Sequence, residues 1–152
     1  MDHRIPAGEN FLNGYNCAQA VVVAFCDVLN MDRETCARMS SAFGGGMGRM
    51  REVCGAVSGM LMVLSLLYGY DTPGDDVSKK ALYTDVQTLA GRFRERAGSI
   101  ICRDLLGNPP SDPNPTPRTA EFYKTRPCGK MVMLAAELMD EFLKEHPLEG
   151  HR

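Results

Sequence analysis

The feature that most constrains the fold of this chain is the stretch from Cys54 to Tyr68, which is apolar almost all round. A helix with apolar side chains on nearly every face is usually buried among other elements. At about 1.5 Å per residue such a helix would be about 22 Å long. The longest apolar run of the chain, from Met60 to Tyr70, is shorter than the roughly 20 residues that cross a bilayer. We therefore expect a buried central helix and no membrane insertion.

Four further segments carry apolar residues at helical spacing. Asn16 and Asp32 stand where N-caps are expected before two of them, and no segment alternates between apolar and polar residues as a half-buried strand does. The four segments are residues 14–30, 32–43, 75–98 and 127–145. The sequence therefore predicts an all-α fold, a bundle of about five main helices with a buried central helix.

The length of 152 residues is typical of one domain, so we expect residues 1–152 to form a single helical domain. Residues 108–118 contain five prolines, which excludes a helix or a central strand there. We expect a semi-rigid loop at 108–118 within the domain. An all-apolar central helix in so small a bundle is also compatible with a homodimer, in which more apolar surface would be buried.

The charge balance excludes one class of partner. The chain has 17 basic and 19 acidic residues and a formal net charge of −2, whereas nucleic-acid-binding proteins usually show a basic patch or a basic excess. The N-terminal residues lack the apolar core of a secretory signal, so we expect a cytoplasmic protein. In a reducing compartment, the six cysteines are more often metal ligands or redox groups than structural disulfides.

The positions of four cysteines relative to the expected helices are informative. Cys17 follows the expected N-cap Asn16, Cys54 begins the central helix, Cys128 begins the last helix, and Cys102 lies in a short turn. Unpaired N–H groups and the helix dipole at such positions favour the thiolate. A free cysteine of pKa near 8.5 is only about 3% ionised at pH 7, and a helix N-terminus or a basic neighbour can lower that pKa to roughly 3.5–7.5.

The other two cysteines are expected to have a structural role. Cys26 lies within a predicted helix and is turned away from Cys17, and Cys36, in the first turns of a polar helix, is expected to be partly exposed. Unpaired cysteine often acts simply as a small apolar side chain.

Small residues surround Cys54. Gly55, Ala56 and Gly59 would let another segment approach the first turns of the central helix. The glycine-rich stretch 44–51 before it is open to two interpretations. It either lets the backbone pass close to Cys54, or it binds an anion. The candidate anion-binding residues are Gly44, Gly45, Gly46, Arg49 and Arg51. Arg51 is also a candidate for lowering the pKa of Cys54.

The segments "GYNCAQAV" and "FGGGMGRMREVCGAVSG", followed by two later cysteines, resemble the C-GCAxxG-C-C family, whose members are described as redox-active. The resemblance extends from about Phe11 to Leu143. It maps the four family cysteines onto Cys17, Cys54, Cys102 and Cys128. It implies a prokaryotic redox protein without a settled substrate. A related domain occurs in cytochromes that carry an iron–sulfur cluster, so the resemblance is also compatible with a bound iron–sulfur cluster.

Three functional hypotheses follow. The first is thiol–disulfide chemistry at Cys17, Cys54, Cys102 and Cys128, with Cys54 as the nucleophile and Cys17 or Cys128 as the resolving thiol; an oxidoreductase is compatible with it. The second uses the same four thiols to bind an iron–sulfur cluster or zinc. The third is a helical bundle that binds an anion or another small ligand. The expected partner is a redox protein or a small-molecule substrate.

The histidines favour all-sulfur ligation in the metal hypothesis. They lie near the ends of the chain and none occurs in its central part. They are His3, His146 and His151.

Overall fold

The computed structural model describes residues 2–148, so His151 lies outside the described residues. The described chain is helical, and its only β-type pairing is a single antiparallel bridge between Val53 and Ile101. In chain order the helices are α1 (Arg4–Leu12), α2 (Cys17–Ala24), α3 (Cys26–Leu29), α4 (Arg33–Ser40), the 3-10 helix η1 (Ser41–Phe43), α5 (Gly44–Met47), α6 (Gly55–Tyr68), α7 (Asp76–Ala97), α8 (Cys102–Leu106), α9 (Ala120–Thr125) and α10 (Cys128–Glu145). The all-α expectation is thus confirmed for these residues.

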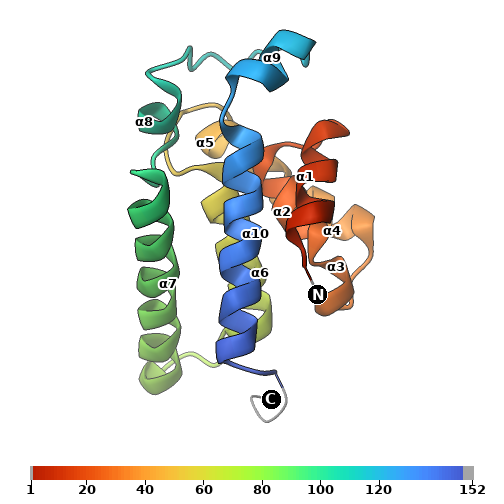
Figure 1. Ribbon diagram of the computed structural model, residues 1–152. Helices are drawn as coiled ribbons and strands as arrows, with labels where there is room; N and C mark the ends of the chain where they lie inside the picture. The colour runs from red at the N-terminus through yellow and green to blue at the C-terminus, as the bar shows by residue number, and fades with distance from the viewer. Residues whose placement is uncertain (1, 149–152) are drawn as a thin grey trace.

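The long helices run side by side. Helix α10 packs against α1, α2, α6 and α7, and α6 packs against α2 and α7. Figure 1 shows that α6 and α10 begin at the same end of the bundle, where α7 ends, and that α5, α8 and α9 lie at this end as well. This arrangement gathers several helix N-termini in one region.

Two helix starts are fixed by the side chains that the sequence indicates. Asn16 caps α2, since its side chain accepts a hydrogen bond from the Gln19 N–H at 2.9 Å and the Gln19 side chain accepts one from the Asn16 N–H at 3.1 Å. Asp32 caps α4 by accepting from the Thr35 N–H at 2.9 Å. Such caps each stabilise a helix by about 1 kcal/mol. The Asn16 cap also fixes where Cys17 begins its helix.

The expected buried helix is α6, and it is buried along one face only. Its buried side chains join the hydrophobic core, whereas Leu66 is 41% exposed and Ser65 is also exposed. The buried residues are Gly55, Ala56, Val57, Gly59, Met60, Val63, Leu64 and Leu67. A nearly all-apolar sequence has therefore left some apolar surface in contact with solvent.

The expected number of about five main helices is wrong. All five expected segments are helical, but the first is divided at Phe25 into α2 and α3, and α1, α5, α8 and α9 are additional. Helix α1 has little periodicity of its own because Pro6 and Gly8 interrupt it. It is held by tertiary packing, in which Ala7 and Phe11 are buried against α2 and α10.

The proline-rich loop connects α8 to α9 without a helix or strand of its own. It is fixed by two arginines of the glycine-rich segment. Arg49 donates to the carbonyl of Asp112 at 2.6 Å and to the Thr116 hydroxyl at 2.8 Å, and Arg51 donates to the carbonyl of Pro110 at 3.0 Å. The loop therefore closes over the same end of the bundle. No helix of the described residues has the length and apolar character needed to cross a membrane.

Candidate functional site: four cysteines at one end of the bundle

The four cysteines singled out from the sequence meet at one place. Cys17, Cys102 and Cys128 are the first residues of α2, α8 and α10, and Cys54 directly precedes α6. All four line one small cavity of about 30 Å³, which also has Arg51 in its wall. The structure thus brings together thiols that come from four separate helix starts.

Glycines allow the start of α2 to lie against the start of α6. A Cβ atom added at Gly55 would lie 3.1 Å from the Cβ atom of Cys17, and one added at Gly59 would lie 2.7 Å from the carbonyl oxygen of Ala18. These distances leave no room for a larger side chain. The interpretation that small residues admit a neighbouring segment at this point is therefore confirmed.

The glycine-rich loop makes the second close approach. A Cβ atom added at Gly46, whose φ is +71°, would lie 2.7 Å from the Cβ atom of Cys102. The loop is attached to the segment around Cys102 by backbone hydrogen bonds. The N–H of Cys102 donates to the Glu52 carbonyl at 2.6 Å, and the N–H of Cys54 donates to the Ile100 carbonyl at 2.8 Å. These bonds fix Cys54 and Cys102 in one cavity.

Several backbone N–H groups in the second half of this loop are already used within the loop. These backbone N–H groups donate to carbonyls of the same loop. The Arg49 N–H donates to the Gly44 carbonyl at 3.2 Å and the Arg51 N–H to the Gly45 carbonyl at 3.2 Å. The Glu52 N–H donates to the Gly46 carbonyl at 2.9 Å. Left-handed backbone at Arg49 and Arg51, with φ of 67° and 62°, accompanies this tight path. Each such residue costs of order 1 kcal/mol or more. The side chains of Arg49 and Arg51, which line the neighbouring cavity, are available to an anion.

Cys128 is the thiol that the site activates. Its hydrogen bond with Cys17 lowers the pKa of Cys128 to about 7, and the positive charges of Arg126, Arg118 and Arg51 act in the same direction, against the effect of burial. At pH 7 about half of such a thiol is ionised, compared with about 3% for an ordinary cysteine.

Cys54 does not have the lowered pKa that its place at a helix start led us to expect. Burial raises the pKa of Cys54 to about 11, although the backbone N–H groups of Ala56 and Val57 favour its thiolate. Only 6% of Cys54 is exposed, so loss of solvation outweighs the helix terminus. Arg51 does not compensate, since its Nη1 donates to the Cys102 sulfur at 3.8 Å instead.

The remaining two thiols of the cavity are also held in the protonated form. The hydrogen bond to Cys128, followed by burial, raises the pKa of Cys17 well above the ordinary value. Burial raises the pKa of Cys102 despite the opposing effect of Arg51. Among these four thiols, only Cys128 has a lowered pKa, because only Cys128 combines a thiol partner with the charges of several arginines.

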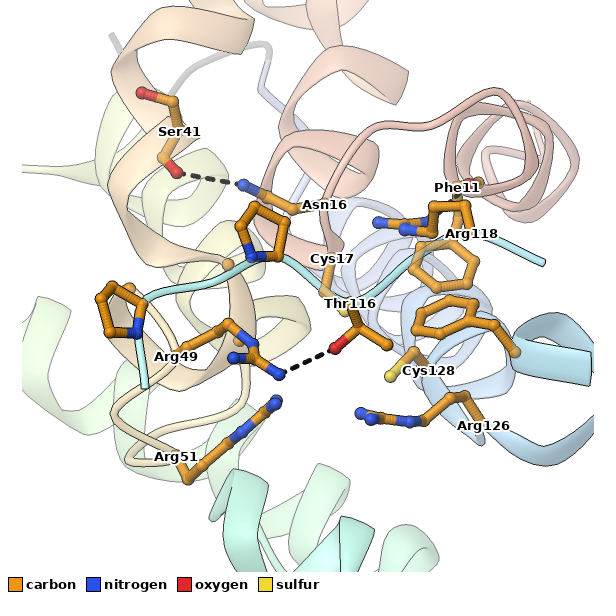
Figure 2. Close-up of a pocket in the computed structure, with 16 residues that line it drawn as sticks. Phe11, Asn16, Cys17, Ser41, Arg49, Arg51, Thr116, Arg118, Arg126 and Cys128 are labelled. Atoms are coloured by element: carbon orange, nitrogen blue, oxygen red, sulfur yellow. Dashed lines mark hydrogen bonds between the residues drawn. The ribbon is translucent and has the colours of Figure 1, made fainter. Parts of the chain in front are cut away.

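A larger cavity of about 310 Å³ lies beside the thiols and includes Cys17 and Cys128 in its wall. Figure 2 shows Arg49, Arg51 and Arg126 pointing into this cavity from two sides, with Cys128 next to them. Its other lining residues are Phe11, Asn16, Ser41, Gly44, Gly45, Gly48, Pro113, Pro115, Thr116, Arg118 and Phe122. Of the predicted anion-binding residues, all but Gly46 line this cavity, and Gly46 lines the smaller one.

Sequence reasoning did not find two of these charged residues. Arg118 ends the proline-rich loop, and its guanidinium lies 4.6 Å from the ring centre of Phe11 and donates to the Tyr15 carbonyl at 3.1 Å. Arg126 lies two residues before Cys128 and packs over Phe122 at 5.3 Å. The closeness of Arg126 to Cys128 in sequence was a usable signal. Nothing in the sequence indicated Arg118.

The two remaining cysteines lie outside both cavities. Cys26 is half-buried, and Cys36 is completely buried in the hydrophobic core. The expectation that Cys36 would be partly exposed is wrong, because the apolar side of α4 packs against α2. Their expected role as apolar side chains agrees with these positions.

The donor groups of the site bear on whether it can hold a metal ion. Among residues 2–148, no group of three or more histidine, cysteine, aspartate or glutamate side chains is placed to hold one ion. The four thiols share a cavity wall but do not converge as a tetrahedral sulfur site requires. In this arrangement the described side chains do not form a site for a single metal ion, and we derive no step through zinc or a cluster.

The protein is thus a small all-α bundle whose site is built from cysteines. These thiols lie at helix starts, next to arginines. The family model described as "Putative redox-active protein (C_GCAxxG_C_C)" matches residues 15–142, and the chain belongs to this family. Comparison with curated proteins finds no match, and neither does comparison with solved structures. The family resemblance noted in the sequence is thus confirmed.

Proposed function

We propose that the protein carries out thiol–disulfide exchange, with Cys128 as the attacking thiolate and Cys17 as the resolving thiol. One observation carries this proposal: Cys17 and Cys128 both line the small cavity and the larger accessible one, and the effects of Cys17 and of nearby arginines lower the pKa of Cys128 to about 7. The thiolate is the form that attacks a disulfide, and a thiol with a pKa near the ambient pH is the best attacking group.

The proposed reaction needs two steps. The Cys128 thiolate attacks one sulfur of a substrate disulfide, a mixed disulfide forms on Cys128, and the other half of the substrate leaves as a thiolate that takes up a proton. Cys17 then loses its proton to the departing sulfur and attacks the Cys128 sulfur. The Cys17–Cys128 disulfide forms and the second half of the substrate leaves. Two electrons pass from the protein to the substrate, and an external dithiol restores the reduced protein.

Cys54 and Cys102 have a different place in this proposal. Burial raises the pKa of both thiols, so neither competes with Cys128 for the first attack. They lie in the small cavity behind the reactive pair. Cys54 is therefore replaced by Cys128 as our candidate for the nucleophile. Because the pair must be kept reduced between cycles, the proposal suits a reducing compartment such as the cytoplasm.

The test is to oxidise the reduced protein anaerobically with diamide and to map its disulfides by mass spectrometry. We expect a Cys17–Cys128 bond and the loss of two titratable thiols. Cys17→Ser should retain the diamide adduct on Cys128, because the second thiol that would displace the hydrazine is missing, and Cys128→Ser should form neither product. Cys26→Ser is the matched control and should behave as the wild type.

Two outcomes would contradict the proposal. The first is the loss of two titratable thiols from Cys128→Ser at the wild-type rate, which would mean that other cysteines form the redox pair. The second is an anaerobically purified protein with stoichiometric iron and sulfide, or stoichiometric zinc, bound through its cysteines. The latter would favour the metal hypothesis over dithiol chemistry.

A further inference from the structure

Arg51 is the most unusual side chain next to the reactive pair. It is only 4% exposed, and its Nη2 atom has no hydrogen-bond partner in the part of the chain that the structure describes. Its Nε donates to the Pro110 carbonyl at 3.0 Å and its Nη1 reaches the Cys102 sulfur at 3.8 Å. A guanidinium stays charged at all ordinary pH values. A buried donor without a partner needs an explanation, and a bound acceptor group supplies one.

The charge around Arg51 has one sign. The larger cavity is lined by four arginines and by no carboxylate among the described residues, although the whole chain has a net charge of −2. Arg49 is partly neutralised by the Asp112 carboxylate at 3.2 Å. Arg118 donates to backbone carbonyls, not to an acid. The cavity is therefore a concentrated positive region beside the thiolate.

The size and walls of the cavity limit what it can hold. Its volume of about 310 Å³ is at the small end of ligand-binding cavities. Phe11, Phe122, Pro113 and Pro115 supply an apolar wall, and Cys128 and the arginines supply the polar part. In Figure 2 the Arg51 and Arg126 side chains approach from opposite sides, and the Cys128 sulfur lies beside Arg126. The charges of both arginines act on the Cys128 thiol. A ligand bound by these arginines would lie next to that sulfur.

We infer that this cavity binds small organic disulfides that carry carboxylate groups, with Arg51 and Arg126 holding a carboxylate while the disulfide lies at Cys128. The inference rests on the proposed function and adds the substrate class to it. Arginine suits this task because its planar fork bonds both oxygens of a carboxylate. The apolar wall would face the methylene groups of such a molecule. The leaving thiol carries its carboxylate away, and the chemistry is otherwise that of the two exchange steps above.

The experiment compares three disulfides that differ in charge. The probes are 3,3′-dithiodipropionate, which is a dianion, bis(2-hydroxyethyl) disulfide, which is neutral, and cystamine, which is a dication. The rate of mixed-disulfide formation is measured for each in Cys17→Ser, which traps the product on Cys128. We expect the dianion to react at least about tenfold faster than the neutral probe at low salt, and cystamine to react most slowly.

Arginine variants then test whether Arg51 and Arg126 cause the faster reaction of the dianion. In the Cys17→Ser background, Arg51→Gln and Arg126→Gln should each bring the dianion-to-neutral rate ratio down toward one. The ratio cancels any change in the thiolate fraction of Cys128. Arg94→Gln, on the exposed side of α7, is the matched control and should keep the ratio. If Arg51→Gln fails to fold, Arg126→Gln alone carries the test.

A second measurement is independent of thiol chemistry. Suberate, a dicarboxylate of similar length without sulfur, should raise the melting temperature of the reduced wild type, whereas 1,8-octanediol should not, since only suberate binds the arginines. Equal rates for all three disulfides, with no effect of suberate, would overturn the substrate class and leave the proposed function intact. If no disulfide reacts with Cys128 but suberate binds, the proposed function fails and an anion-binding protein remains.

Discussion

The buried side chains of His3 and Arg51 differ in how completely the protein pairs their polar atoms. His3 is 3% exposed, and both of its ring nitrogens face carboxylates, with Nδ1 at 2.6 Å from Asp140 and Nε2 at 3.1 Å from Asp27. Its ring stacks on Phe25 with ring centres 4.1 Å apart. Every polar atom of the His3 side chain is thus satisfied by the protein. This cluster joins the start of α1 to α3 and α10.

Arg51 is nearly as buried as His3 but is incompletely paired. One of its terminal nitrogens has no partner within residues 2–148, and the acids that could neutralise it are absent from the cavity wall. The difference teaches that a fully paired buried charge serves the fold, while a buried charge left open beside a reactive thiol is available to a ligand. The following predictions test this contrast.

The largest effect is expected when the paired cation is removed. His3→Ala leaves the Asp140 and Asp27 carboxylates without their shared partner, so we expect unfolding to become easier by about 3 kcal/mol, at the low end for a broken buried pair. The low end applies because Asp27 is 46% exposed. Urea unfolding at pH 6 measures this change. The pH profile of Cys128 alkylation should not move; a shift there would mean that the two clusters are not independent.

The next effect concerns the close packing that the cysteine end requires. Gly59→Ala places a methyl group 2.7 Å from the Ala18 carbonyl oxygen, and overpacking of this kind costs about 2 kcal/mol. It should also slow formation of the Cys17–Cys128 disulfide, since α2 must move. Chemical unfolding and diamide oxidation measure the two effects.

Gly91 on α7 is the matched control for this substitution. No atom lies within 4 Å of a Cβ added there, so Gly91→Ala should raise stability by about 0.5–1 kcal/mol through helix propensity alone. It should leave oxidation unchanged. Equal effects of the two alanine substitutions would contradict the packing argument.

Removal of the unpaired cation should affect chemistry more than stability. Arg51→Gln should change the free energy of unfolding by no more than about 1 kcal/mol, since two lost hydrogen bonds are offset by the loss of a buried charge that lacks a full set of partners. It should raise the pKa of Cys128, which Arg51 helps to lower. Iodoacetamide alkylation followed against pH gives this value, with a wild-type midpoint near 7. An unchanged midpoint would mean that Arg51 does not act on the Cys128 thiol.

The smallest effect is a pH dependence of stability. Burial lowers the pKa of His3, but the Asp140 and Asp27 carboxylates outweigh it and raise that pKa above 6.5. The folded protein therefore holds the proton more tightly than the unfolded chain, so the stabilisation is complete below about pH 6.5 and is lost as the pH rises through the folded value. The difference in unfolding free energy between wild type and His3→Ala should therefore become smaller as the pH rises. A difference that grows with pH would contradict this assignment.

Local sequence was sufficient for much of the fold. The caps at Asn16 and Asp32 and the apolar periodicity located the main helices, because both depend on residues a few positions apart. Helix α1 was not predicted from the sequence, because its stability comes from packing against α2 and α10. The division of the first expected segment at Phe25 likewise depends on what surrounds that residue, including the His3 ring.

The amino-acid order by itself determined that Cys17, Cys54 and Cys128 stand at helix starts, since capping and periodicity are properties of neighbouring residues, whereas only the structure shows that Cys102 begins a helix. It also supplied the small residues Gly55 and Gly59 that let the helices meet. Only the tertiary structure decided that Cys128, and not Cys54, has the lowered pKa, and that Arg118 and Arg126 lie beside it. Burial, hydrogen-bond partners and nearby charge set that pKa, and these come from segments far apart in the chain.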